Sequence, residues 1–219
     1  MSKFDKDYLL FFSELEINNN REWFAQNKER FKSVVEEPFV QFIDAILKEI
    51  KKLDKKLKIE AKDCVFRIYR DVRFSKDKTP YKIRMSALLA AGGRKDFKNP
   101  SLYIELGADQ LKVYSGLYEP DKVHLEKIRN KILKHTAEFT KLRKSKAFVK
   151  QFHEILGDKA KRLDPKFSAI SEIEPLIFNK AFYFSSEQDA EIILKGKAEK
   201  WVLDCYKNAK AMNDFLTVH

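Results

Sequence analysis

Apolar residues near the start of the chain recur every three or four positions, the spacing of an amphipathic helix. The first stripe covers residues 4–16, and the polar asparagines after it end the pattern. Asn19, with Glu22 three residues later, predicts a capping pair that opens a second helix. A longer stripe follows, and Pro38 within it predicts a helix that restarts near Glu37.

The pattern changes at residue 63, where β-branched and aromatic residues gather in short runs. Gly107-Ala108-Asp109 predicts a tight turn between the last two runs. Because the connections are short, the runs favour an antiparallel arrangement; parallel neighbours would need long crossovers. The expected strands lie within residues 65–74, 83–91, 102–106 and 111–117.

Helical spacing returns after Pro120 and continues to a closing helix that contains Trp201 and Phe215. A short strand is also expected at 181–184. Helices, then strands, then helices predict an α+β fold, an antiparallel sheet of about four strands flanked by N-terminal and C-terminal helices. We expect a single domain over residues 1–219, helical in 1–60, with the sheet in 63–118 and mostly helical in 121–219.

The net charge of the chain indicates which kind of partner it could bind. Lys and Arg total 44 against 33 Asp and Glu, a net charge of +11. Residues 63–84 carry +4 and residues 121–166 carry +8, so the excess lies in the middle of the chain. Such a bias suits an anionic small molecule or a polyanion, and the alternative is a lysine-rich solvated surface.

Other signals narrow the class of protein. The two cysteines, Cys64 and Cys205, form no disulfide framework, and no CxxC or paired-histidine spacing predicts a metal site. The chain shows no signal segment and no apolar run of membrane-spanning length, so we expect a cytoplasmic protein with no membrane partner. Nothing in the sequence assigns a cofactor or decides whether the chain is an enzyme.

One segment, residues 66–82, concentrates the polar chemistry. On a strand, alternate side chains share a face, so Arg67, Asp71 and Arg73 would point the same way. A polar turn would then return two lysines beside them. Arginine suits planar, bidentate contact with carboxylate or phosphate. The predicted ligand-binding residues are Arg67, Arg70, Arg73, Lys78 and Lys82. Asp71, Tyr69 and Asp77 are the candidates for proton transfer.

The same segment, FRIYRDVRFSKDKTPYK, resembles the signature of a conserved hypothetical family, the domain of unknown function 2461. Two further stretches are similar to that family's patterns. They are Asn18-Asn19 with Trp23-Phe24 and Lys28, and Gly116-Leu117-Tyr118-Glu119-Pro120 with Ile128-Arg129. The resemblance implies one domain with the 66–82 segment as its characteristic feature, and it implies no activity or substrate.

These observations support three hypotheses. The first is a site for a phosphorylated or carboxylated small ligand in the 66–82 segment, because its cations outnumber its carboxylates. The second is non-specific nucleic-acid binding, which is less favoured because no recognition motif is present. The third is a structural or assembly protein with no catalytic site, in which Asp71 and the arginines hold the segment together.

Overall fold

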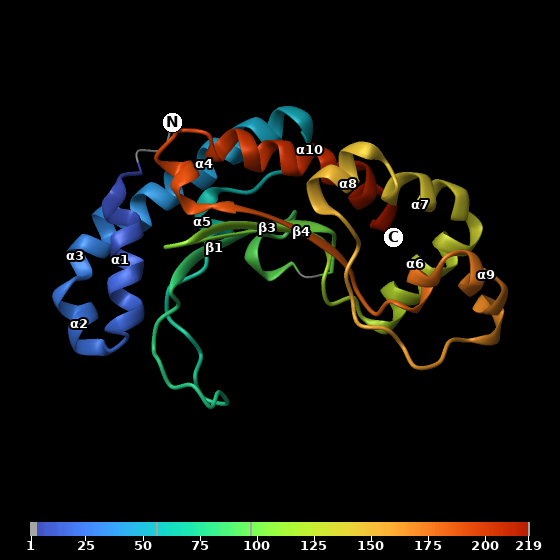
Figure 1. Cartoon of the computed structure of the whole chain (residues 1–219), viewed down its shortest axis with the longest axis horizontal. Helices are drawn as coiled ribbons and strands as arrows, with labels where there is room; N and C mark the ends of the chain where they lie inside the picture. Colours follow the sequence, from blue (N-terminus) through green and yellow to red (C-terminus); the bar gives the residue numbers. More distant parts are fainter. Residues whose placement is uncertain (1–3, 56, 97, 219) are drawn as a thin grey trace. The chain divides into compact units, whose positions relative to one another are not determined.

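The computed structural model describes residues 4–55, 57–96 and 98–218. Its strands form one antiparallel four-stranded sheet in the order β1-β2-β3-β4, with helices before and after it (Figure 1). The strands are β1 (Arg84–Leu89), β2 (Ser101–Gly107), β3 (Gln110–Leu117) and β4 (Phe182–Asp189). The predicted α+β class with a four-stranded antiparallel sheet is confirmed.

The helices fall into two groups along the chain. Before the sheet lie α1 (Lys6–Ile17), α2 (Arg21–Gln26), α3 (Lys28–Arg30), a π-helical turn η1 (Phe31–Glu36), α4 (Glu37–Leu53) and α5 (Ala61–Cys64). After β3 lie α6 (Lys122–Lys134), α7 (Thr136–Arg143), α8 (Lys146–Phe152), α9 (Ser168–Ile173) and, after β4, α10 (Ala198–Leu216). Short 3-10 turns are η2 (Gly93–Lys95), η3 (Pro165–Phe167), η4 (Pro175–Phe178) and η5 (Ala190–Ile193). Across the described ranges, no helix has the length and apolarity to cross a bilayer.

The chain divides into two compact units whose residue ranges alternate along the sequence. The first comprises 1–94, 103–113 and 187–203, and the second comprises 95–102, 114–186 and 204–219. The strands β2, β3 and β4 contribute residues to both.

The expected strand at residues 65–74 is not one of the four sheet strands. Only single bridges occur there, from Val65 to Ala87 and from Tyr69 to Tyr81. The fourth strand is β4, which begins where a short strand was expected at 181–184 and runs on to Asp189. The polar residues between Arg70 and Pro80 explain the difference, because they bond to one another in place of a sheet neighbour.

The strand β2 is buried on one face. Along β2, the apolar residues Leu102, Ile104 and Leu106 are buried and alternate with partly exposed ones. Period-two alternation of this kind is what a strand with one covered face requires. α4 contributes an apolar stripe, including Phe42 and Ile46, and packs with α5 against β1. The opposite face of β2 carries the partly exposed Tyr103 and Glu105, whereas β1 is buried on both faces after Arg84.

The turn between α1 and α2 departs from the expected capping pattern. Asn20, not Asn19, is the N-cap of α2, and its side chain accepts a hydrogen bond from the Trp23 backbone N–H. Asn19 is therefore free for a contact far along the chain. Near Glu37, where a restart was expected, the helix changes type without a break: the π-helical turn η1 ends at Glu36 and α4 begins at Glu37 with Pro38 in its first turn, while the backbone at Glu36 and Glu37 stays helical.

In the second unit, phenylalanines from α7 and α8 pack on β4. Phe139 and Phe148 contact Phe182 and Phe184, with ring centroids 6.3 and 4.8 Å apart. Gly116 on β3 has φ +98°, and a Cβ there would lie 2.3 Å from the Phe182 carbonyl oxygen. A side chain at this position is thus excluded by both the backbone conformation and the approach of β4.

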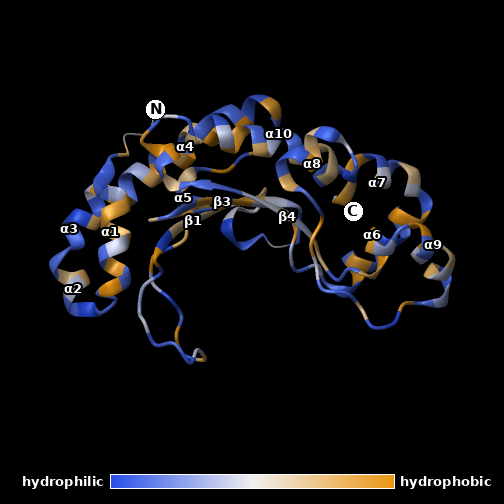
Figure 2. Ribbon diagram, viewed as in Figure 1, coloured by the Kyte–Doolittle hydropathy of each residue, from blue (hydrophilic) through white to orange (hydrophobic). Residues whose placement is uncertain are grey.

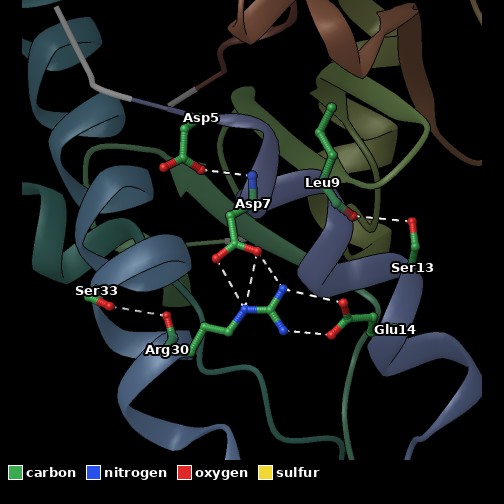
Figure 3. A network of polar contacts seen from close by, with 7 residues as sticks. All are labelled: Asp5, Asp7, Leu9, Ser13, Glu14, Arg30 and Ser33. Carbon is green, nitrogen blue, oxygen red and sulfur yellow. Dashed lines mark hydrogen bonds and ion pairs between the residues drawn. The ribbon is translucent and has the colours of Figure 1, made fainter.

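An arginine ties the N-terminal helices together (Figure 3). Arg30, at the end of α3, donates from Nε to Asp7 Oδ2 over 3.1 Å and from Nη1 to Glu14 Oε2 over 2.5 Å. Both carboxylates are on α1, and the guanidinium also lies 5.5 Å from the centroid of the Phe11 ring. Hydrogen bonds to the two carboxylates raise the pKa of Arg30, so it stays charged at any ordinary pH.

We predict that Arg30→Met destabilises the protein, because it leaves two carboxylates of α1 without their common partner. With Arg30 25% exposed and both carboxylates about a third exposed, solvent screening limits the effect. Urea denaturation should show a loss of about 1–2 kcal/mol. Lys32→Met is the matched control, an exposed site a few residues on, and should change stability by less than about 0.5 kcal/mol. Equal midpoints for the two variants would contradict the role given to Arg30.

Candidate functional site

Residues 66–82 form a long loop between α5 and β1, which we call the signature loop. It runs away from β1 in Figure 1, and most of it is hydrophilic in Figure 2. Its two arms pair only near the base, where the Lys82 N–H donates to the Ile68 carbonyl over 2.8 Å and the Arg70 N–H donates to the Pro80 carbonyl over 2.9 Å. Beyond this ladder the arms separate and are held by side chains.

The base of the signature loop is fixed by Asn19. Its Nδ2 donates to the Tyr81 carbonyl over 3.0 Å, and its Oδ1 accepts from the Tyr81 N–H over 3.1 Å. The Phe24 ring stacks on the Tyr81 ring, with centroids 4.0 Å apart and an interplanar angle of 16°. Tyr69 lies on the other arm, its ring centroid 5.3 Å from that of Tyr81. The turn and first residues of α2 thus hold both arms of the loop.

Two ion pairs organise the outer part of the signature loop. Arg70 donates from Nη1 to Asp77 and to the Thr79 hydroxyl, which joins one arm to the other. Arg73 pairs with Asp71 two residues away, Nη2 to Oδ2 over 2.7 Å. Hydrogen bonds from Arg73 lower the pKa of Asp71 to about 2. The Thr79 backbone N–H, followed by Arg70 and the Thr79 hydroxyl, lowers the pKa of Asp77 to about 2.

A second group of charges lies at the foot of the loop, at the start of β1 and on the partly exposed side of β2. Arg84 Nε pairs with Glu105 Oε1 over 2.9 Å, and the Tyr103 hydroxyl donates to the same oxygen over 3.0 Å. Lys82 is half-buried, with Nζ 5.2 Å from the centroid of the Phe66 ring. We call Arg67, Lys82 and Arg84 the basic cluster.

Electrostatics link the members of the basic cluster. Burial lowers the pKa of Lys82, Arg84 and Arg67 lower it further, and Glu105 opposes them. Within the described residues, neither Lys82 nor Arg67 has a carboxylate in ion-pair distance. Burial also raises the pKa of Tyr103 to about 12, so its hydroxyl stays protonated and remains a donor to Glu105. Lys82 and Arg84 thus share Glu105, whose side chain is 13% exposed, while Arg67 also acts on Asp71 and helps to lower the pKa of that carboxyl.

The sequence-predicted residues divide into three groups. Arg70 and Arg73 are paired with Asp77 and Asp71, and Arg67 and Lys82 belong to the basic cluster. Lys78 donates from Nζ to the Val72 carbonyl over 2.9 Å. Tyr69, a candidate for proton transfer, is 48% exposed among aromatic rings at the loop base. Whether one anion can bridge these groups stays a prediction.

Arg84, Tyr103 and Glu105 were not singled out from the sequence. A usable signal was present, because the alternation of Leu102, Ile104 and Leu106 leaves Tyr103 and Glu105 on the face opposite the core. The register that brings β1 beside β2, and hence Arg84 beside Glu105, could not be read from local pattern. In the described chain, no three His, Cys, Asp or Glu side chains are grouped to hold a metal ion.

We predict that Asp71 titrates near pH 2, well below the ordinary value of about 3.9. The folded-state pKa is lowered, so the ion pair stabilises the loop above about pH 4, and this stabilisation is lost as the pH falls through about 2. Carboxyl-carbon NMR should show the Asp71 pKa rising toward its ordinary value in Arg73→Met. Asp77 is the internal control: its low pKa rests on Thr79 and Arg70 and should persist. An unchanged Asp71 pKa in the variant would refute the pairing.

A family model matches nearly the whole chain. The family model described as conserved hypothetical protein (DUF2461) matches residues 7–215, which confirms the resemblance seen in the sequence. No curated protein and no solved structure matches the chain. The matched range includes the α1–α2 turn, the signature loop and the basic cluster. The chain therefore belongs to the family of conserved hypothetical proteins called DUF2461.

Proposed function

We propose that this protein binds a small phosphorylated or carboxylated ligand at the basic cluster. The observation that carries the proposal is Lys82, a half-buried ammonium with no carboxylate in ion-pair distance in the described ranges. A desolvated charge is costly unless a counter-charge completes it. Glu105, the carboxylate that acts on Lys82, is already engaged by Arg84 and Tyr103.

The chemistry of the cluster suits an oxyanion. Arg84 and Arg67 supply planar guanidinium groups for bidentate contact, and Lys82 supplies a compact point charge between them in sequence. The Tyr103 hydroxyl and Glu105 fix the position of Arg84 from β2. An anion with several oxygens, such as a phosphate or a dicarboxylate, would satisfy all three cations at once.

The remaining predicted residues have a supporting part in this proposal. Arg70 and Arg73 already have carboxylate partners, so they hold the signature loop in shape and offer fewer free donors. Asp71 and Asp77, proposed for proton transfer, are committed to those arginines in the same contacts. The alternative hypothesis, a structural protein whose loop has no ligand, predicts no response to any anion.

A panel of anions tests the proposal by thermal shift. Inorganic phosphate, pyrophosphate, a nucleoside monophosphate and a dicarboxylate such as citrate are the probes. We expect at least one to raise the Tm of the native protein, because a ligand that binds the folded state stabilises it by mass action. In Lys82→Met, which keeps an apolar stem and removes the charge, affinity should fall about tenfold to a hundredfold, the worth of one charge-assisted hydrogen bond.

The matched control is Lys76→Met, which replaces an exposed lysine of the same loop. Anions should raise the Tm of this variant as much as they raise that of the native protein. Without ligand, Lys82→Met should be at least as stable as the native protein, since it removes an uncompensated half-buried charge. A Lys82→Met protein that is as stable as the native protein without ligand, but whose Tm no longer rises with anions, would identify Lys82 as a binding residue. A structural residue would instead lower the stability when it is replaced. If no anion stabilises the native protein, or if Lys82→Met keeps the full shift, the structural alternative is the better account.

A further inference from the structure

An aromatic side chain at the outer end of the signature loop is almost fully exposed. Phe74 is 94% accessible to solvent. Isolated exposed apolar residues are ordinary, but a phenylalanine this exposed contributes almost no burial energy to the fold. We call residues 71–78 the loop tip. Phe74 is the feature of the loop tip that the anion site at its foot does not use.

The loop tip is held by its own polar groups. The Lys78 ammonium and the Ser75 backbone N–H both donate to the Val72 carbonyl, over 2.9 and 3.4 Å. The Arg73 guanidinium, paired with Asp71, lies 5.7 Å from the centroid of the Phe74 ring. The phenyl ring is thus presented on a braced turn with one cation beside it, so a partner would meet a partly pre-organised surface.

The cations of the loop are spread along its length. Lys76 and Lys78 are exposed at the tip and, over the described residues, have no carboxylate in ion-pair distance. Lys82 and Arg67 lie at the foot of the loop and likewise have no carboxylate in ion-pair distance among the described residues. Five residues separate Tyr69, in the bridge to Tyr81, from Ser75, so the tip lies at most about 20 Å from the bridge, the span of six steps at about 3.3 Å each. A polymer with repeating charges can contact such a row, whereas one compact anion cannot.

We infer that the loop tip binds single-stranded nucleic acid, with one base stacked on Phe74 and backbone phosphates at Lys76 and Lys78. Exposed aromatic rings interleaved with basic residues are the elements that bind single strands, and stacking accepts any base. The chemistry predicts weak, salt-dependent binding without sequence preference. An anionic bilayer fits less well, because Phe74 and Tyr69 are the sole large apolar side chains exposed in the loop.

Fluorescence anisotropy with a labelled 15-nucleotide oligothymidine tests the inference across a salt series. Phe74→Ala should weaken binding about tenfold at low salt, within the range that loss of one base stack produces. Phe74→Trp, which keeps an aromatic face, should bind as tightly as the native protein. Tyr118→Ala is the matched control, since Tyr118 is 63% exposed outside the loop, and it should leave the affinity unchanged. Inorganic polyphosphate, which has charges but no bases, should bind native and Phe74→Ala protein equally.

The outcomes separate this inference from the proposed anion site. Phe74→Ala should keep the full thermal shift with small anions, because Phe74 makes no contact with the basic cluster in the described contacts. If small anions do not raise the Tm of the native protein but oligonucleotide binding depends on Phe74, the inference holds and the proposed function is wrong. Three results would overturn the inference: no oligonucleotide binding at low salt, equal affinity in Phe74→Ala, or Phe74-dependent binding only to phosphatidylserine vesicles.

Discussion

The side-chain amide of Asn19 makes to Tyr81 the two hydrogen bonds that a neighbouring strand would make, one to its N–H and one to its carbonyl. The rest of the signature loop depends on this contact, because no sheet strand in the described part of the chain flanks Tyr81 on that side. The Phe24 ring stacks on Tyr81 and brings α2 against the same point. Because Asn19 fixes the backbone of Tyr81, it also positions the next residue, Lys82. The basic cluster depends on that position.

The family's sequence patterns acquire physical reasons in this structure. The Asn18-Asn19 and Trp23-Phe24 patterns anchor the signature loop, so two motifs distant in sequence meet at Tyr81. Gly116 lies where β4 approaches too closely for a side chain. Arg129, on α6, donates from Nε to the Ile177 carbonyl over 2.9 Å and from Nη2 to the Asn179 carbonyl over 3.0 Å, which holds the turn before β4. Both of these later motif residues shape the second unit, and neither belongs to the proposed anion site.

Much of the fold followed from periodicity, and the parts that did not have physical causes. The alternation in β2 and the turn at 107–109 predicted a hairpin, because local side-chain burial and turn chemistry decide it. The strand expected at 65–74 did not form, since Asp71, Asp77 and the arginines satisfy one another. In the site, Arg67 and Lys82 were predicted from charge. Arg84 and Glu105 required the β1–β2 register, and the Asn19 contact to Tyr81 spans 62 positions, beyond any local pattern.

Hydrogen exchange at the base of the signature loop tests the anchoring role of Asn19 most directly. The Lys82 and Arg70 amides, which pair the two arms, should be protected in the native protein. In Asn19→Ala, which leaves both backbone groups of Tyr81 without this partner, these two amides should exchange at least about tenfold faster while the amides of α4 keep their native rates. Asn99→Ala, the same substitution at an exposed residue whose side chain bonds to Asp96, should change neither set. If Lys82 and Arg70 in Asn19→Ala keep their native protection, the loop is held by other contacts and the account is wrong.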